Sequence, residues 1–368
     1  MARARTAEVE ALPESDRAGD LPHPRERLEL FGHAAAATTL AQAARSGRLH
    51  HAWIVAGPKG VGKATLAWRF ARALLTYGPA ACPDDLAVAA EHPVQRQIAA
   101  LSHPDLLLVR RPWDTDRKRF RVELPVEEVR RLHSFFARHS SYGGARVAIV
   151  DAADDMSRSA QNALLKILEE PPSGALLLLV SHVPGALLPT TRSRCRMLTL
   201  RPLNTTAMAQ AVTALAPQTK PADRELLSAL AEGAPGRALQ LAEANALEIY
   251  GELIELLSSL PRLNGARLFA LAEKIARAPA ERGLGLFVAL LAQLEERLVR
   301  GALAALPPVP GEEPLMRHLR TVVAADRWPG LWEDLRFKAA RADELNLDKK
   351  QLVLNTFFAI EAAAKLPG

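Results

Sequence analysis

Short apolar runs alternate with helical patterns along the first two hundred residues. Each run is too short for a helix and is bounded by polar or glycine-rich positions, which predicts buried strands. The stretches between the runs repeat their apolar positions every three or four residues, which predicts amphipathic helices. Strands separated by helices indicate an α/β fold with a parallel sheet covered on both faces. The predicted strands lie at 51–56, 106–109, 147–151, 174–182 and 197–200, and the main helices at 28–49, 63–75, 125–139 and 160–168.

The two ends of the chain lack this alternation of strands and helices. Residues 1–24 mix charges, Ala and Pro without periodicity, which predicts a disordered tail. Beyond Leu203 the pattern is three short helices and then an almost continuously helical stretch, interrupted by a predicted loop at 307–314. The sequence therefore predicts four parts: a tail (1–24), an α/β domain (25–202), a small three-helix segment (203–246) and an all-α domain (247–368).

A glycine-rich loop joins the first predicted strand to the following helix. Such glycines let backbone N–H groups converge on phosphate oxygens, and a lysine at the start of the helix reaches the terminal phosphates. The residue after the lysine is normally Ser or Thr, which binds Mg²⁺, but here it is Ala64. Thr65 points about 100° away around the helix and is a poor substitute. The loop therefore predicts a degenerate nucleotide site, or one kept only as structure, formed by Gly57, Gly60, Gly62, Lys63 and Thr65.

The strand at 147–151 ends in a carboxylate, Asp151. At the carboxyl edge of a nucleotide-binding sheet, such a carboxylate holds Mg²⁺ near the phosphates. An ATPase of this type places a glutamate at the next position to polarise the attacking water, and this chain has Ala152 there. Asp151 is thus predicted to belong to the nucleotide site, or to be a remnant that hydrogen-bonds the phosphate loop.

Composition narrows the class of protein. The 368 residues are 49% hydrophobic and carry a net charge of +6, which favours a helix-rich, soluble, intracellular protein. No apolar run approaches the ~20 residues of a membrane span, and the N-terminus lacks a secretory signal. The two cysteines, Cys82 and Cys195, exclude a disulfide framework and a four-thiolate zinc site. The densest basic segment, 110–119, is interpreted as an exposed loop rather than a nucleic-acid site.

Three segments in this order resemble the clamp-loader branch of the AAA+ family: Gly57–Lys63, Gln161–Pro172 and Leu187–Cys195. The second and third motifs are specific to that branch, whereas the phosphate loop alone is not. The segment 233–238 is similar to the one that carries the family's second sensor arginine, here Arg237. The resemblance covers about residues 25–245, and it implies an AAA+ sheet domain followed by a three-helix lid and an all-α collar, which residues 247–368 fit by length and pattern.

Clamp loaders are five-subunit rings with ATP sites at the subunit junctions. The resemblance, with Ala64 and Ala152, implies a non-hydrolysing subunit that supplies Arg194 in trans to the ATP of a neighbouring subunit. It implies ATP or ADP bound without hydrolysis, and no zinc, because only Cys82 stands where the family has a cysteine cluster. The implied partners are the ATPase subunits and the delta subunit of the ring, with the sliding clamp and primed DNA, in the cytoplasm near the nucleoid and away from membranes.

Alternatives stay open at this stage. The chain could be an ATPase in its own right, with Asp154 or Glu169 replacing the missing glutamate, or a sequence-independent DNA-binding protein. Arg194 could be a plain surface residue, and Arg237 could simply hold the lid against the sheet. Asp154, together with Asp155, could be a helix N-terminal charge.

Overall fold

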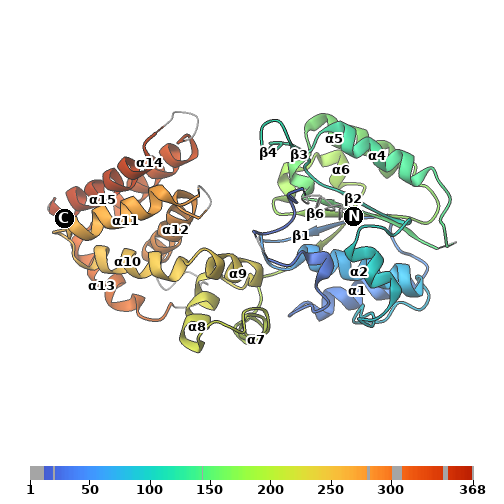
Figure 1. Ribbon diagram of the computed structural model, residues 1–368, viewed down its shortest axis with the longest axis horizontal. Helices are drawn as coiled ribbons and strands as arrows, with labels where there is room; N and C mark the ends of the chain where they lie inside the picture. Colours follow the sequence, from blue (N-terminus) through green and yellow to red (C-terminus); the bar gives the residue numbers. More distant parts are fainter. Residues whose placement is uncertain are drawn as a thin grey trace, which may run out of the picture. The chain divides into compact units, whose positions relative to one another are not determined.

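The structure is a computed structural model that describes residues 12–19, 21–142, 144–279, 282–300, 309–342 and 347–366. It divides into two compact units, Met1–Asn204 and Thr205–Gly368. The first unit contains the parallel sheet, and the second contains helices and no strand among its described residues (Figure 1). The predicted α/β fold class, with a sheet flanked by helices and a helical C-terminal part, is therefore confirmed.

The sheet of the first unit has five parallel strands in the order β2-β5-β6-β1-β7. All five were predicted from apolar runs, and the strand that feeds the glycine-rich loop lies between β6 and β7. The strands are β1 (Ala52–Ala56), β2 (Leu106–Val109), β5 (Arg146–Asp151), β6 (Ala175–Ser181) and β7 (Arg196–Thr199).

Helices cover both faces of this sheet because alternate residues of a strand point to opposite sides. Trp53 and Val55 of β1 face one apolar cluster, and Ile54 faces the other. Helices α1 and α2 pack on the first face, and α4 and α5 on the second (Figure 1). The helices of the unit are α1 (Ala34–Arg45), α2 (Lys63–Tyr77), α3 (Pro93–Ala99), α4 (Val126–Phe136), α5 (Arg158–Glu169) and α6 (Pro189–Arg192).

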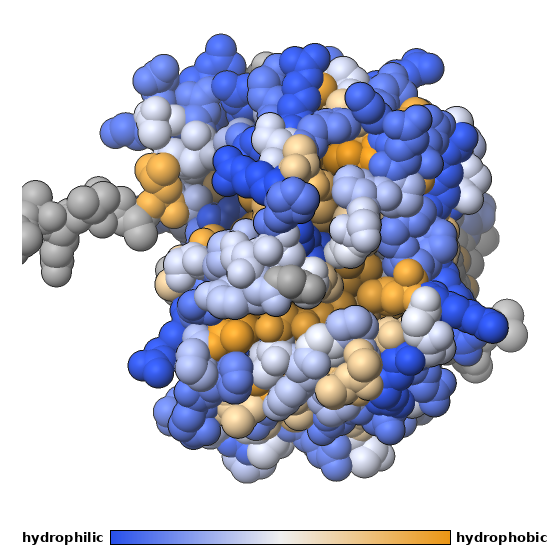
Figure 2. All heavy atoms as spheres, turned by 90° about the vertical axis from the view of Figure 1, so that its right-hand side faces the viewer, coloured by the Kyte–Doolittle hydropathy of each residue, from blue (hydrophilic) through white to orange (hydrophobic). Residues whose placement is uncertain are grey.

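From the side, the layered build of this unit is visible as a hydrophobic band. The band crosses the face seen in Figure 2, with mostly hydrophilic atoms above and below it. This distribution is expected when an apolar sheet lies between two layers of amphipathic helices, each of which turns its polar side to the solvent.

The first described residues differ from the prediction of a disordered tail. Residues 12–19 and 21–27, here called the N-terminal strap, pack against the first unit and end in a single 3₁₀ turn, Pro24–Glu26. The Asp16 carboxylate lies 2.8 Å from His23 Nε2, and both side chains are fully buried. Arg72 of α2 donates to the backbone carbonyls of Arg25 and Arg27. Buried polar contacts of this kind order a segment that composition alone classifies as disordered.

Helix α1 begins later than predicted. The pattern predicted a helix from residue 28, whereas α1 starts at Ala34. The carbonyl of Leu28 accepts a hydrogen bond from the Arg69 guanidinium of α2, so it is committed to a tertiary contact. The residues before α1 continue the strap instead of extending the helix.

A small hairpin projects from the first unit between β2 and α4 (Figure 1). It consists of β3 (Trp113–Asp114) and β4 (Arg119–Phe120), which pair in antiparallel fashion. The sequence predicted an exposed loop here, because strands of two residues leave no periodic signal.

The second unit contains nine helices among its described residues. Buried leucines and two facing phenylalanines, Phe287 and Phe357, fill its core. The predicted loop at 307–314 lies partly outside the described residues, and α13 already begins at Glu312, which places Pro314 in its first turn, where proline is tolerated. The helices are α7 (Thr205–Leu215), α8 (Pro221–Leu230), α9 (Pro235–Glu243), α10 (Ala246–Ser258), α11 (Gly265–Arg277), α12 (Leu284–Arg300), α13 (Glu312–Val322), α14 (Trp328–Ala340) and α15 (Lys349–Lys365).

A helix that crosses a bilayer must be both long enough and apolar enough. Within the described ranges, no helix meets both requirements for crossing a membrane.

Candidate phosphate-loop site

The glycine-rich loop has the backbone that the sequence predicted. Gly57 has φ 145°, and a Cβ there would lie 2.4 Å from the carbonyl oxygen of Leu200, so no other residue fits. Gly60 and Gly62 also have positive φ, 81° and 109°, which side chains rarely adopt. Gly62 is the N-cap of α2, and the helix therefore opens directly from the loop. This is the backbone geometry that presents N–H groups to an anion.

Lys63 is folded onto its own loop. Its ammonium group donates to the carbonyl oxygens of Gly57 at 2.7 Å and Pro58 at 2.6 Å. Burial lowers the pKa of Lys63 to about 8, against the opposing attraction of Asp151 and Asp154. The lysine is thus held at the loop, beside the carboxylates of the sheet edge.

Asp151 ends β5 and is buried at the carboxyl edge of the sheet. Burial is the main cause that raises its pKa to about 8, and the nearby negative charge of Asp16 adds to it, while Lys63 lowers it. The carboxyl group is therefore largely protonated at neutral pH. The next residue, Ala152, has only a methyl group where a water-activating carboxylate would be needed.

The strap reaches this same edge. Arg110 directly follows β2, whose Val109 pairs with Val150 of β5, so Arg110 comes at the same edge of the sheet as Asp151, the last residue of β5. Arg110 binds Asp16 at 2.6 Å and Glu14 at 2.9 Å. The sequence did not predict these contacts, because Arg110 lies more than ninety positions from either acid in the chain.

Asp154, one of the two carboxylates considered as a replacement base, has another role. It accepts hydrogen bonds from the Ser181 hydroxyl at 2.5 Å and from the backbone N–H groups of His182 and Val183. It therefore joins the 3₁₀ turn after β5 (Ala153–Asp155) to the end of β6. Neither it nor Asp155 caps α5, whose N-cap is Ser157. No local sequence signal predicts this contact.

Arg194 lies between α6 and β7 with its side chain 37% exposed. Its guanidinium contacts Glu169 at the end of α5 (Nη2 to Oε1, 2.9 Å) and donates to the carbonyl of Thr190 at 3.0 Å. Glu169, the second carboxylate considered as a base, is thus engaged by this arginine. Among the described residues, the polar contacts of Arg194 are with α5 and α6 and not with the phosphate loop.

Two other predicted site residues have different surroundings. Thr65 lies half-buried in the first turn of α2. Arg237 belongs to the second unit, where it opens α9 and contacts Glu232 at 3.4 Å. Glu232 also accepts a hydrogen bond from Gln293 of α12. Within that unit, Arg237 is therefore part of a polar cluster between the α8–α9 turn and α12.

Comparison with known proteins points to one group. The family model described as "DNA polymerase III, delta subunit" matches residues 32–204. Proteins named DNA polymerase III subunit delta' are 35% identical over 206 residues in Pseudomonas aeruginosa and 33% identical over 200 residues in Escherichia coli K12. A DNA polymerase III subunit tau/gamma from Haemophilus influenzae is 30% identical over 215 residues.

These matches are partial. They cover 56%, 54% and 58% of this chain, and 60%, 56% and 29% of the respective relatives. A solved structure of a DNA polymerase III gamma subunit-related protein from Thermotoga maritima aligns with 90% of this chain and 100% of its own, with 17% identity and a TM-score of 0.43. In sequence, the first unit thus resembles the delta-prime subunits of bacterial DNA polymerase III.

Proposed function

We propose that this chain is a non-hydrolysing, delta-prime-like subunit of a DNA polymerase III clamp loader. In this role it supports ATP-driven loading of a sliding clamp onto primed DNA, as part of a five-subunit ring with the ATPase subunits and the delta subunit, in the cytoplasm at the replisome. It supplies Arg194 to the ATP bound by a neighbouring subunit.

One observation carries the non-hydrolysing part of the proposal. Hydrolysis needs a carboxylate that polarises water at the carboxyl edge of the sheet. Ala152 occupies the usual position, burial holds Asp151 largely protonated, and three donors engage Asp154. Asp155 contacts Arg111 at 2.8 Å. Each described carboxylate of the segment after β5 is therefore already committed.

The phosphate loop supports binding more than chemistry. Its positive-φ glycines, its position at the start of α2 and Lys63 fit the phosphates of ATP or ADP. Ala64 removes the hydroxyl that would hold Mg²⁺, and we propose that nucleotide binds here without being hydrolysed. The residues of this degenerate site would be Gly57, Gly60, Gly62, Lys63, Thr65, Asp151 and Arg237, without zinc.

Arg194 is suited to act on another subunit's nucleotide. The transferring phosphoryl group accumulates negative charge, which a guanidinium stabilises with several donors. Before it can do so, Arg194 must leave Glu169, whose side chain is 50% exposed. An exposed ion pair of this kind contributes at most about 1 kcal/mol to stability, so breaking it requires little free energy.

The test is ATP turnover by the reconstituted loader with clamp and primed DNA. Arg194→Ala should slow turnover at the junction it serves by about 10³-fold or more, as for other in-trans arginines. Arg192→Ala is the matched control, because Arg192 is an exposed arginine two residues earlier and should leave turnover unchanged. Equal turnover by the Arg194→Ala and wild-type complexes would refute the in-trans role.

The tau/gamma match supports a second candidate, an active clamp-loader ATPase. It predicts substantial hydrolysis by the isolated chain and its loss in Lys63→Ala. Under the favoured proposal the isolated chain binds nucleotide but shows no turnover that depends on Lys63.

A further inference from the structure

The β3–β4 hairpin has a fixed conformation in spite of its size. Trp113 and Phe120 lie opposite each other across the two strands, with ring centroids 4.9 Å apart in a T-shaped arrangement. The Asp114 carboxylate accepts the backbone N–H of Arg117 at 2.9 Å, which closes the turn. Lys118 takes a left-handed φ of 48°. The aromatic pair and the turn closed by the Asp114 side chain thus fix the backbone conformation of the hairpin tip.

The hairpin carries an excess of exposed positive charge. Arg117, Lys118 and Arg119 form its tip, and Arg121 follows β4; all four are exposed. In the part of the chain that the structure describes, none of these four cations has a carboxylate within 4 Å. The arginines at the base differ, since Arg110 pairs with the strap and Arg111 with Asp155. The hairpin also carries two acids. Asp114 closes the turn, and the exposed Asp116 directly precedes Arg117, so the four cations outnumber the carboxylates by two.

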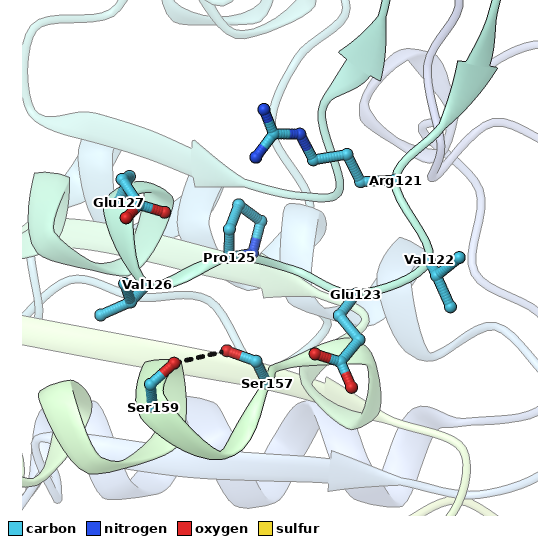
Figure 3. A pocket seen from close by; sticks show the side chains of 8 residues that line it. All are labelled: Arg121, Val122, Glu123, Pro125, Val126, Glu127, Ser157 and Ser159. Carbon is cyan, nitrogen blue, oxygen red and sulfur yellow. Dashed lines mark hydrogen bonds between the residues drawn. The ribbon is translucent and has the colours of Figure 1, made fainter. Parts of the chain in front are cut away.

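The surface beside the hairpin shows where an anion would not bind. A cavity of 490 Å³ lies where the chain leaves β4 and enters α4 (Figure 3). Arg121 lines it, but so do Glu123 and Glu127, whose charges oppose an anion. The favourable potential is therefore at the tip, outside this cavity, where three basic side chains follow one another along the chain.

We propose that the tip of the β3–β4 hairpin, Arg117 to Arg119 with Arg121, binds the phosphate backbone of duplex DNA. Consecutive unpaired cations repel each other, and a polyanion relieves this repulsion while releasing its counterions. Arginine and lysine side chains are frequent donors to phosphate oxygens, and the proposed contact is to the DNA backbone rather than to base edges. The choice of DNA as the polyanion rests on the proposed function, whereas the anion-binding surface does not.

The test uses the full chain alone and a fluorescently labelled duplex, with binding followed by anisotropy at several salt concentrations. The variant is the triple substitution Arg117→Gln, Lys118→Gln and Arg119→Gln. The control has the same change of charge at exposed arginines elsewhere in the first unit, through Arg48→Gln, Arg96→Gln and Arg138→Gln. Thermal unfolding of both variants should match the wild type, because all six side chains are exposed.

Three phosphate contacts account for a slope of about 2.7 in log affinity against log salt. We expect the hairpin variant to lose this slope and the control to keep it. The ratio of wild-type to variant affinity should therefore shrink on the order of 40-fold between about 50 and 200 mM salt.

Several results would overturn the proposal. These are equal slopes for the wild type and the hairpin variant, absence of duplex binding by the wild type at about 50 mM salt, and competition by poly-glutamate as strong as that by DNA, which would indicate an acidic protein partner. The assay contains no ATP and no other subunit. Failure here is therefore distinct from failure of the turnover test on Arg194.

Discussion

Replacement of Asp16 by alanine tests whether the N-terminal strap is held as the structure describes. The Asp16 side chain is fully buried and contacts His23 Nε2 at 2.8 Å and Arg110 Nη1 at 2.6 Å. His23 Nδ1 accepts the backbone N–H of Arg25, so in the neutral ring the proton lies on Nε2, facing the carboxylate. Asp16→Ala removes the acceptor of that buried proton.

The magnitude follows from the groups left behind. His23 Nε2 loses the carboxylate that lies 2.8 Å away and stays buried without any acceptor beside it, which costs up to about 1–3 kcal/mol. Arg110 keeps Glu14 at 2.9 Å and therefore does not become an unpaired buried charge. With the lost charge-assisted bond to Arg110, docking of the strap should weaken by about 3 kcal/mol, which is about 100-fold in its equilibrium constant. Because the N-terminal strap can detach while the rest of the unit stays folded, the free energy of global unfolding should fall by less than this amount.

Amide hydrogen exchange of peptides spanning residues 12–30 measures this opening directly. Asp16→Ala should lower their protection about 100-fold and leave the peptides of β5 and β6 unchanged, whereas Asp116→Ala, at an exposed aspartate, should change neither. Unchanged protection of the strap in Asp16→Ala would refute the reasoning.

Acid provides a second route to the same release. The pKa of Glu14 is raised by burial but lowered more by its contacts with Arg25 and Arg110, to about 2. The pKa of Asp16 is also lowered. An acid with a lowered pKa in the folded state contributes stability above its unfolded pKa and loses it as pH falls. Protection of the strap should therefore persist at pH 5 and above and decline from about pH 4.5 towards 2.

Two further predictions concern the core of each unit. Asp151 has a pKa of about 8 in the folded chain, well above the value of about 4 in the unfolded chain. Between these two pH values the Asp151 carboxyl group ionises only in the unfolded chain, so the free energy of unfolding falls as pH rises from about 4 to 8. Asp151→Asn mimics the neutral form, and its thermal unfolding temperature should exceed that of the wild type by a margin that grows over this range; a margin independent of pH would contradict this assignment. In the second unit, Phe287→Ala removes a fully buried ring and should cost about 3–5 kcal/mol in urea unfolding, whereas the exposed Val299→Ala should change little. Equal midpoints for these two variants would show that Phe287 is not in a packed core.

The sequence predicted those parts of the fold whose signals are local. Strand β5 is a run of apolar residues, and α5 combines a helical repeat with a Pro-Pro stop, so both were predicted. The phosphate loop was predicted from the order of strand, glycines and lysine, because the backbone conformation depends on those residues themselves.

Features that depend on distant partners were not predicted. The strap is composed like a disordered tail, but Arg25 donates to the carbonyl of Ala99, 74 residues away. Asp154 looked like a helix-start charge, whereas its donors lie at the end of β6, 27 to 29 residues later. Such contacts exist only once the sheet has brought the segments together, so composition and periodicity contain no trace of them.

Under the proposed function, the position of Lys63 makes nucleotide binding an exchange reaction. A phosphate that enters the loop gains the ammonium group only by displacing the carbonyls of Gly57 and Pro58, each already within 2.7 Å. Hydrogen bonds to a charged group contribute about 1.5–3 kcal/mol each, so the two together offset at least about 100-fold of the affinity that the lysine would otherwise provide. We therefore expect nucleotide occupancy of the loop to depend on a small free-energy difference between two hydrogen-bonded states of Lys63, and to shift with modest changes in nucleotide concentration or in pH near 8.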